Sequence, residues 1–323
     1  MTEQDADEAP LVVVVTPTYN GARYLRETMD SVQAQTWPNL IHLVLDNAST
    51  DGTAALLAEY AGARVPVQVI RNAQTLPQKA NWNAAFRHVP ASARYVRLLC
   101  DDDTITPDSI ERMARLAETD PEITVVGGLH DCAGAVQDFR WPADRQVFGG
   151  AEAVRMALLG EGKLMPVQML WRKSAVDART PLFDDYMKTG WDMDAAYAMI
   201  AGGKYGFVHA CVGFTRVHAG TVTAQLVNKS PRVWTRDALD LLRKYGPLAF
   251  GPAYPRELRR FRRYYVRRML LWKRQGDGLD IHLDALKRAG WRWSPLLVAD
   301  AMLAWALQRL GLQRNWPGYP GWQ

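Results

Sequence analysis

Short apolar runs that alternate with helix-like segments constrain the fold of this chain more than any other feature. Leu11–Val15 is an unbroken aliphatic run, and Ile41–Leu45, Val67–Ile70 and Tyr95–Leu99 follow it at similar spacing. The first run is apolar at every position, which is typical of a strand buried on both faces, as in parallel sheets. Because helical segments separate the runs, we expect an α/β fold with a mainly parallel central sheet.

Polar side chains follow three of these runs at the point where each run ends. Thr16–Asn20 follows the first run, Asp46 and Asn47 follow the second, and Asp101–Asp103 follows the fourth. In such sheets ligands bind beyond the carboxyl ends of the strands, and right-handed crossovers place those ends along one edge. The sequence therefore predicts a polar, acidic cleft at this edge.

The acidic triplet Asp101–Asp103 has two interpretations. Adjacent carboxylates repel one another, and burying them without a partner is costly. A hard divalent cation would relieve the repulsion, because Mg²⁺ and Mn²⁺ take oxygen ligands and often share them with substrate phosphates. A solvated acidic turn that caps the next helix would explain the same residues.

The two other strand ends leave similar alternatives. Asp46 suits a hydrogen bond to a nucleobase or ribose, but Asp46–Gly52 is also typical of an Asx-rich turn in which Asp51 precedes a helix. Tyr19 suits stacking on a base, and a half-buried aromatic side chain would be equally ordinary at that position.

Taken in order, these segments resemble the successive motifs of the family 2 glycosyltransferases, which are inverting enzymes with the GT-A fold. The matching segments are Val15–Asn20, Ser31–Pro38, Leu45–Gly52, Asn81 and Leu99–Pro107. The match covers residues 11–118 and continues more loosely to residue 223. The resemblance is to members of the bacterial surface-polysaccharide type. It implies a GT-A-type nucleotide-binding fold, a nucleoside-diphosphate sugar as donor, and Mn²⁺ or Mg²⁺ as cofactor.

The resemblance also implies which residues bind the nucleotide. Asp46 would contact the base, and Asn81 falls at the family's asparagine in the helix before the fourth strand. Lys79, beside it, is a phosphate-facing candidate from its charge alone. The residues that would line the nucleoside pocket are Thr16, Pro17 and Tyr19.

In the triplet, Asp102 matches the acid that holds the metal and the diphosphate. Asp103 would support it as a metal ligand, and Asp101 would lie nearer the ribose. Two positions depart from the family's pattern, since Asn47 replaces a second aspartate and Cys100 stands where many members begin an Asp-x-Asp. Which acid of the triplet binds the metal directly therefore stays open.

The segment Trp191–Asp194 resembles the Glu-Asp segment of the family, with tryptophan in place of glutamate. By this resemblance Asp192 is the general base that deprotonates the acceptor hydroxyl. A helix turns Asp194 by about 200° from Asp192, so only one of the two acids faces the cleft easily. The alternative is an acid placed at a helix N-terminus by the macrodipole.

The segment Thr215–His218 resembles the Arg-x-His that ends the catalytic core in many family members. By this resemblance Arg216 would neutralise the diphosphate, and His218 would contact the metal or a phosphate. A histidine without such a partner is more often structural. Earlier in this half, Pro166–Arg172 is expected to form a strand and Trp191–Ala201 a helix.

The composition changes in the last third of the chain. Between Pro255 and Gln275 nine arginines and lysines stand against one acid, Glu257. Residues 256–274 can form a solvated helix face or contact an anionic membrane, and we expect no nucleic acid partner. Ser294–Leu312 is apolar with few interruptions, which predicts a packing helix or an interfacial one.

We expect four parts along the chain. They are a disordered lead-in at 1–10, a nucleotide-sugar-binding half at 11–128, an acceptor-binding half of the same catalytic domain at 129–228, and a helical, basic, tryptophan-rich region at 229–323. The N-terminus has no secretory pattern, and the three cysteines have no paired spacing. We therefore expect a cytoplasmic protein, peripheral at the inner face of the cell membrane.

Together these features predict an enzyme of polysaccharide or glycoconjugate biosynthesis. It would move a sugar from a nucleoside-diphosphate sugar to a hydroxyl of a glycan or lipid-linked acceptor. A UDP-sugar is the expected donor. A sugar nucleotidyltransferase is disfavoured because Thr16–Asn20 lacks the glycine-rich loop and basic residue of that class. A catalytically silent sugar-nucleotide-binding or scaffolding subunit is the other alternative, supported by Asn47, Cys100 and Trp191.

Overall fold

The computed structural model describes residues 9–132, 134–187, 189–218, 232–276 and 278–317. They fall into two compact units. The first, which we call the sheet unit, comprises the described residues up to Gly150 together with Leu164–Tyr186 and Trp191–Val217. The second, the helical unit, comprises Ala151–Lys163, the described part of Met187–Gly190 and the described residues from His218 onward. The boundary expected at residues 228 and 229 and most of the lead-in lie outside the described residues.

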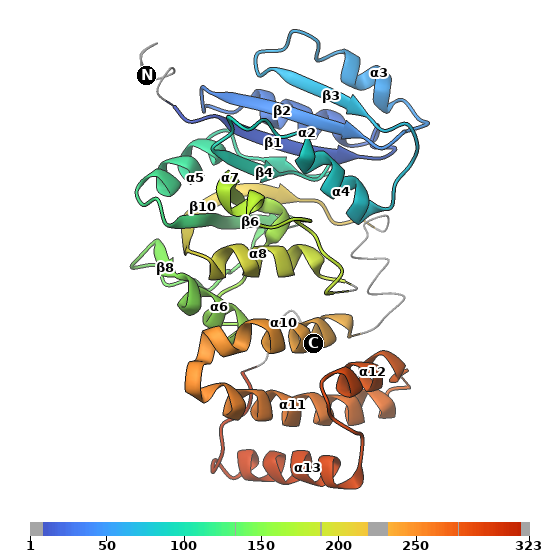
Figure 1. The fold of residues 1–323 in the computed structure, drawn as a ribbon, viewed down its shortest axis with the longest axis vertical. Helices are drawn as coiled ribbons and strands as arrows, with labels where there is room; N and C mark the ends of the chain where they lie inside the picture. The colour runs from blue at the N-terminus through green and yellow to red at the C-terminus, as the bar shows by residue number, and fades with distance from the viewer. Residues whose placement is uncertain (1–8, 133, 188, 219–231, 277, 318–323) are drawn as a thin grey trace. The chain divides into compact units, whose positions relative to one another are not determined.

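A mixed ten-stranded sheet forms the centre of the sheet unit (Figure 1). Its main order is β3-β2-β1-β4-β9-β6-β10-β5, with β7 paired to β6 and β8 paired to β10. The strands are β1 (Val12–Thr18), β2 (Leu40–Asp46), β3 (Val67–Arg71), β4 (Tyr95–Leu98), β5 (Thr104–Ile105), β6 (Ile123–Cys132), β7 (Ala135–Val136), β8 (Val147–Gly149), β9 (Leu170–Arg172) and β10 (Lys204–Thr215).

The four strands β3, β2, β1 and β4 are parallel neighbours, as the apolar runs predict. β1 is buried along its whole length because it has β2 on one side and β4 on the other. Beyond β4 the sheet changes character, since β9 is antiparallel to both β4 and β6. The α/β class is confirmed, and the parallel pairing is confined to β3-β2-β1-β4 and to β6-β10.

The helices of the sheet unit lie between these strands in the chain. They are α2 (Leu25–Gln33), α3 (Thr53–Ala58), α4 (Gln78–Arg87), α5 (Ser109–Glu118), α7 (Lys173–Asp177) and α8 (Trp191–Ala201), with a short 3₁₀ turn η1 (Pro166–Gln168). α8 has the predicted bounds. The strand expected over Pro166–Arg172 is shorter than predicted, because η1 takes its first half and Pro166 has no N–H for a strand ladder.

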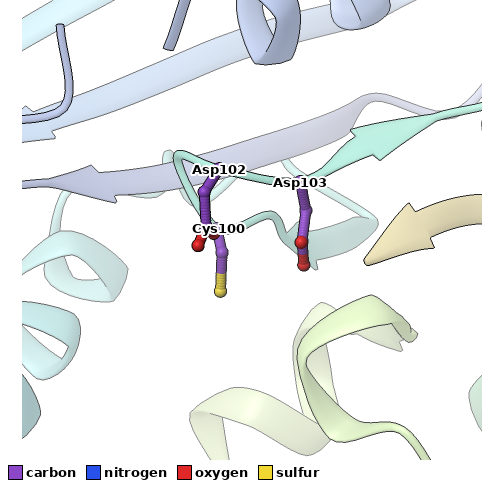
Figure 2. Close-up of side chains that lie close together, drawn as sticks. All are labelled: Cys100, Asp102 and Asp103. Carbon is purple, nitrogen blue, oxygen red and sulfur yellow. The ribbon is translucent and has the colours of Figure 1, made fainter. Parts of the chain in front are cut away.

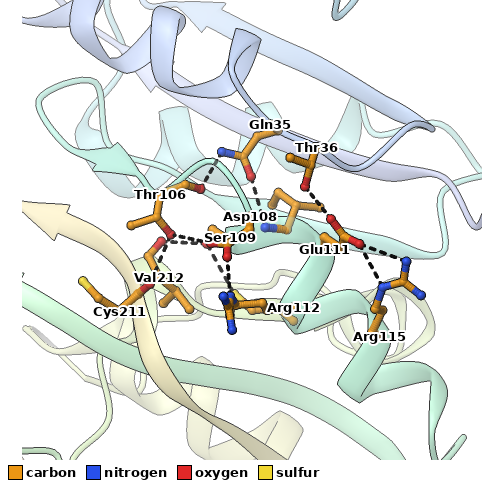
Figure 3. A network of polar contacts seen from close by, with 12 residues as sticks. Gln35, Thr36, Thr106, Asp108, Ser109, Glu111, Arg112, Arg115, Cys211 and Val212 are labelled. Carbon is orange, nitrogen blue, oxygen red and sulfur yellow. Dashed lines mark hydrogen bonds and ion pairs between the residues drawn. The ribbon is translucent and has the colours of Figure 1, made fainter. Parts of the chain in front are cut away.

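A hydrogen-bond network fixes the start of α5 against β10 and the end of α2 (Figure 3). Ser109 Oγ donates to the Val212 carbonyl at 2.6 Å, and Thr106 Oγ1 donates to the Cys211 carbonyl at 3.1 Å. The Gln35 side chain donates to the Thr106 carbonyl at 2.8 Å and accepts from the α5 backbone. These bonds anchor the segment that follows the acidic triplet.

The helical unit is built mainly from four helices near the end of the chain. α11 lies between α10 and α13, and α12 packs on α10 (Figure 1). Across the residues described, no helix combines the length and the apolar character that crossing a bilayer requires. The helices in this part of the chain are α6 (Gly150–Leu159), α10 (Val233–Phe250), η2 (Gly251–Ala253), α11 (Tyr254–Arg274), α12 (Asp280–Arg288) and α13 (Pro295–Arg309).

Candidate functional site

The carboxyl end of β1 contacts the acidic triplet directly. Thr18 Oγ1 donates to Asp101 Oδ2 at 2.5 Å. Gly21 packs against the same pair, and a Cβ atom at this position would lie 2.6 Å from the Asp101 carboxylate and closer still to the Thr18 hydroxyl. Thr18 belongs to the predicted first strand end and Gly21 follows it, but neither was predicted to hold the triplet in place.

The second strand end folds around Asp46, which is buried. Its Oδ1 accepts a hydrogen bond from the Ser49 amide at 2.9 Å, and its Oδ2 pairs with the guanidinium of Arg71. Arg71 also donates to the Ser49 carbonyl at 2.8 Å. The carboxylate therefore stabilises the loop after β2. Its contact with a nucleobase remains a prediction.

Hydrogen bonds join the loops after β1 and β2. The Asn20 amide donates to Ser49 Oγ at 2.9 Å, and Asn20 Oδ1 accepts from the Thr50 amide at 2.8 Å. Asn20 and Ala48 both have a left-handed backbone, with φ of 52° and 57°. Asn adopts this conformation more readily than most residues, whereas at Ala48 the surrounding bonds must offset a steric cost.

Asn81 is connected to the same loops through other amides. Its Oδ1 accepts from Asn72 at 2.8 Å, and Asn72 also donates to Asn47 Oδ1 at 2.9 Å. Asn47 in turn binds the backbone of Leu76 through both ends of its amide. The residue that replaces the family's second aspartate thus orders the segment before α4, a function for which an amide supplies both donor and acceptor.

The acidic triplet and Cys100 form a compact group of potential ligands after β4. One ligand atom from each of Cys100, Asp102 and Asp103 lies within 4.8 Å of the others. Figure 2 shows the three side chains extending to the same side of the loop. Asp101 is directed elsewhere, towards Thr18, so the structure separates it from Asp102 and Asp103.

The acids of this loop repel one another in a poorly hydrated place. Burial, with repulsion from Asp102, raises the pKa of Asp101 to about 6 and that of Asp103 to about 7. Burial and the carboxylates of the triplet also raise the pKa of the Cys100 thiol, and the carboxylate of Asp192 contributes to that shift. Asp192, on α8, therefore lies within electrostatic reach of the loop.

A buried network holds Asp103. Its Oδ2 accepts from Gln168 Nε2 at 2.9 Å, and its Oδ1 accepts from the Arg216 amide at 2.9 Å. Gln168 Oε1 in turn accepts from the guanidinium of Arg97 at 3.1 Å, and Arg97 is fully buried within β4. Burial lowers the pKa of Arg97 to about 9, although attraction by Asp103 opposes the shift. No motif indicated Gln168 or Arg97 as part of the site.

Arg216 lies against the triplet loop, as its place in the motif suggests. Its Nε donates to the Asp102 carbonyl at 3.0 Å, and its guanidinium also pairs with Glu27 at 2.5 Å. The same guanidinium lies over the ring of Tyr24, 4.5 Å from the centroid. A positive charge is therefore fixed at the edge of an acidic group.

The two acids at the start of α8 have different surroundings. Asp194 is fully buried and pairs with Arg179 at 2.5 Å, whereas Asp192 is half-buried. Trp191, which replaces the family's glutamate, packs edge-on against Trp82 and Phe183, each at a centroid distance of 4.9 Å. Asp194 is thus a structural acid, and the assignment of the general base to Asp192 stays a prediction.

The remaining predicted residues have varied surroundings. Thr16 and Pro17 are buried, and Thr16 Oγ1 is 2.9 Å from His42 Nε2, while Tyr19 is half exposed. Lys79 Nζ donates to the Asp184 carbonyl at 3.2 Å and pairs with the carboxylate of Asp185. His218 is half-buried, at the start of the helical unit. The functional roles of these residues stay predictions.

The donor set at the triplet fits a divalent cation. The carboxylates of Asp102 and Asp103 are hard oxygen ligands of the kind that Mg²⁺ and Mn²⁺ take. A cation would also relieve the repulsion that raises the pKa of Asp101 and Asp103. Cys100 adds a softer sulfur ligand to the same group. The residues present therefore suit the predicted cofactor.

A family model described as Glycosyl transferase family 2 matches residues 13–178, which is more than half of the chain. The protein belongs to glycosyltransferase family 2. The matched segment includes the first two strand ends, the acidic triplet and Gln168. Asp192 and Arg216 lie beyond it, so their assignment rests on the motif resemblance and on the geometry given above.

Relatives among characterised and uncharacterised proteins agree with this family. The putative teichuronic acid biosynthesis glycosyltransferase TuaG of Bacillus subtilis is 33% identical over 103 residues, which are 32% of this chain and 40% of TuaG. The uncharacterized glycosyltransferase RP339 of Rickettsia prowazekii is 24% identical over 230 residues, 68% of each chain. The match thus spans less than half the length of TuaG.

Solved structures show the same fold. TarS 1-349 of S. aureus, in complex with UDP-GlcNAc, has a TM-score of 0.58 at 15% identity, over 75% of this chain and 67% of that one. The mannosyltransferase PcManGT of Pyrobaculum calidifontis, in complex with GDP-Man and Mn²⁺, has a TM-score of 0.55 at 18% identity, over 98% of this chain and 86% of that one. The predicted GT-A-type fold with a helical C-terminal region is confirmed.

Proposed function

We propose that this glycosyltransferase moves a sugar from a nucleoside-diphosphate sugar, with a UDP-sugar as the first candidate, to a hydroxyl of a glycan or lipid-linked acceptor. The transfer inverts the sugar's configuration and serves the synthesis of a bacterial surface polysaccharide or glycoconjugate. The names of TuaG and of the TarS complex with UDP-GlcNAc support this class of donor and product.

The nucleoside would lie against the loops after β1 and β2. Tyr19, half exposed beside these loops, would stack on the base, and Asp46 would contact it. Thr16 and Pro17 would form the floor beneath the nucleoside. Asn81 would support this side of the pocket through Asn72.

The diphosphate would lie at the acidic loop. Asp102 and Asp103 would hold the cation, with His218 as a further ligand from the motif, and a bound Mn²⁺ or Mg²⁺ would stabilise charge on the departing diphosphate. Arg216 would add a fixed positive charge from the protein, and Lys79 could do so after leaving Asp185. Asp101, held by Thr18, would lie on the ribose side of this group.

Asp192 would take the proton from the acceptor hydroxyl as that oxygen attacks the anomeric carbon. Inversion requires the attacking oxygen to approach from the face opposite the departing diphosphate, so the base would lie on the other side of the sugar from the metal ligands. The observation that carries the proposal is the compact group of Cys100, Asp102 and Asp103 after β4 in a chain of glycosyltransferase family 2. The electrostatic influence of Asp192, on α8, on the Cys100 thiol supports its assignment as the base.

The acceptor side of the proposal includes the membrane. A lipid-linked acceptor would require the enzyme to work close to a bilayer, and the cations of residues 256–274 were the first candidates for such a contact. These cations lie in α11.

The proposal is tested by a thermal-shift screen of nucleoside diphosphates and their sugars, with and without Mn²⁺. A ligand that binds the folded state raises its apparent stability by mass action. We expect UDP and a UDP-sugar to raise the melting temperature only when Mn²⁺ is present. If no nucleoside diphosphate raises it under either condition, the proposed donor class is wrong.

The base assignment is tested with Asp192→Asn. This variant should bind UDP and Mn²⁺ as the wild type does and transfer sugar about 100-fold or more slowly, because only proton transfer is lost. Asp177→Asn, at an exposed acid of α7, is the matched control and should keep full activity. Transfer by Asp192→Asn at the wild-type rate would show that another group is the base.

A further inference from the structure

The outer face of α13 carries an apolar stripe of five residues, at intervals of three and four. Helical spacing places them on one side of α13, opposite the buried Ala301 and Ala304 on the side that packs on α11. The exposed fractions of the three leucines are 83%, 62% and 71%, from first to last. The members of this α13 stripe are Leu296, Ala299, Leu303, Ala306 and Leu310.

A helix at the surface of a soluble protein normally has a polar outer face. α13 is apolar on both faces, and its only charged residues are Asp300 and Arg309. Asp300 is neutralised within the helical unit, since it pairs with Arg263 at 2.6 Å and with Arg262 at 3.0 Å. Contiguous apolar surface of this kind marks a contact with a membrane or with another molecule.

The charges around the stripe favour one class of partner. Exposed arginines lie before it at Arg292 and at its far end at Arg309 and Arg314. Trp293, 38% exposed, lies beside the first of them, and tryptophan is typical of the boundary between lipid and water. A second copy of this chain would bring arginine against arginine in either orientation of two paired α13 helices, and like charges repel.

We infer that α13 docks on the surface of an anionic lipid bilayer, with the α13 stripe in the acyl boundary and Arg292, Arg309 and Arg314 among the headgroups. The helix has 15 residues, whereas a membrane span needs about 20, so α13 would lie in the plane of the surface. The inference goes beyond sugar transfer and does not depend on it.

This docking mode moves the membrane contact away from the middle of α11. Arg262 and Arg263 pair with Asp300, and Arg260 pairs with Glu257, so these cations act within the helical unit. Other cations of residues 256–274, such as Arg259 and Lys273, are exposed and can add electrostatic attraction. The apolar contact comes from α13.

The inference is tested by co-sedimentation of the full chain with vesicles of phosphatidylcholine and phosphatidylglycerol in equal parts, and with vesicles of phosphatidylcholine alone. We expect binding to the mixed vesicles, weakened by salt and by omission of the anionic lipid. The double variant L303E/L310E should bind the mixed vesicles about tenfold or more weakly, because two exposed leucines that would enter the acyl boundary become charged.

The matched control is Leu283→Glu, at an exposed leucine of α12 outside the stripe, and it should bind as the wild type does. Melting temperatures of both variants near that of the wild type establish that the fold is intact. Three results would overturn the inference. The first is binding by L303E/L310E at the wild-type level, and the second is no binding of the wild type to either vesicle. The third is a wild-type dimer in light scattering that L303E/L310E dissociates, which would identify a second copy as the occupant.

Discussion

Asp46 and the acidic triplet both follow buried parallel strands, but the protein balances their charges differently. The carboxylate of Asp46 pairs with the guanidinium of Arg71. Asp101 and Asp103 are held by neutral groups instead, namely the Thr18 hydroxyl, the Gln168 amide and the backbone N–H of Arg216. At one strand end a carboxylate is paired with a cation, and at the other Asp101 and Asp103 are held by neutral hydrogen-bond donors.

The difference indicates what each strand end can bind. A neutralised carboxylate can order a loop and recognise hydrogen-bond donors such as those of a base. Buried carboxylates that are held by neutral groups favour a cation, since protons are otherwise retained by the acids. Under the proposed function, the uncharged end of a sugar nucleotide would lie at one strand end, and its diphosphate with a metal would lie at the other.

The sharpest test of this comparison replaces one acid at each strand end by asparagine. Asp102→Asn should weaken Mn²⁺ binding in the presence of UDP about 100-fold or more, because a charged ligand is lost. Asp46→Asn, the matched variant, should change Mn²⁺ affinity by less than about threefold. Electron paramagnetic resonance of Mn²⁺ measures both. Equal losses in the two variants would show that the strand ends do not differ in this way.

The pH dependence of stability should follow the triplet. The folded-state pKa values of about 6 and about 7 for Asp101 and Asp103 lie above the ordinary value of 3.8. Between about pH 4 and pH 7 the folded state therefore binds more protons than the unfolded state, and its free energy of unfolding falls as pH rises. We expect the two acids together to contribute a decrease of several kcal/mol in metal-free protein.

Urea unfolding of the wild type and of Asp103→Asn, at several pH values across this range, measures that contribution. The variant should show a shallower decrease, and Mn²⁺ should remove most of the decrease in the wild type because it favours the ionised acids. A steeper decrease in Asp103→Asn than in the wild type would contradict the sign.

The buried network behind Asp103 should matter next. Gln168→Met keeps the size of the side chain but leaves Asp103 and Arg97 each without one partner. We expect about tenfold weaker Mn²⁺ binding and a loss of about 2 kcal/mol in the free energy of unfolding. Gln146→Met, at an exposed glutamine, should change neither. Unchanged Mn²⁺ affinity in Gln168→Met would show that the network only stabilises the fold.

The smallest effect is expected from paired glycine substitutions. In Gly21→Ala the new Cβ would lie 2.6 Å from the Asp101 carboxylate, so the bond to Thr18 must shift, at a cost of about 1–2 kcal/mol. In Gly52→Ala, at the other strand end, the nearest neighbour of the new Cβ is the Ala22 Cβ at 3.7 Å. We expect the free energy of unfolding to change by less than about 0.5 kcal/mol. Thermal unfolding separates the two, and a larger loss in Gly52→Ala would reverse the comparison.

The sequence predicts those parts of the site that are contiguous with buried strands. Each strand end is readable because an apolar run stops at a polar residue, and this pattern survives in a single sequence. Asp46 and the triplet were found in this way. Gln168 and Arg97 were not, because the hydrogen bond between them joins residues 71 positions apart and Arg97 lies inside an apolar run.

The roles of two residues that depart from the family's pattern also became clear only from the structure. Trp191 could have indicated a silent enzyme, but its contacts with Trp82 and Phe183 give it a packing role beside Asp192. Asn47 uses its amide as both donor and acceptor, which an aspartate would not do. In the helical unit the composition of 256–274 drew attention to α11, while the exposed apolar surface belongs to α13, because burial depends on which faces pack together.

The bonds of Asp103 have a consequence for how the protein is made. The carboxylate is held by Gln168, 65 residues further along the chain, and by Arg216, 113 residues further along. During synthesis the triplet leaves the ribosome well before either partner exists, and such distant pairings form late in folding. The order of translation therefore delays the ordering of the proposed metal site until β10 has joined the sheet, and a nascent chain that ends before Arg216 would carry these acids without the groups that hold them.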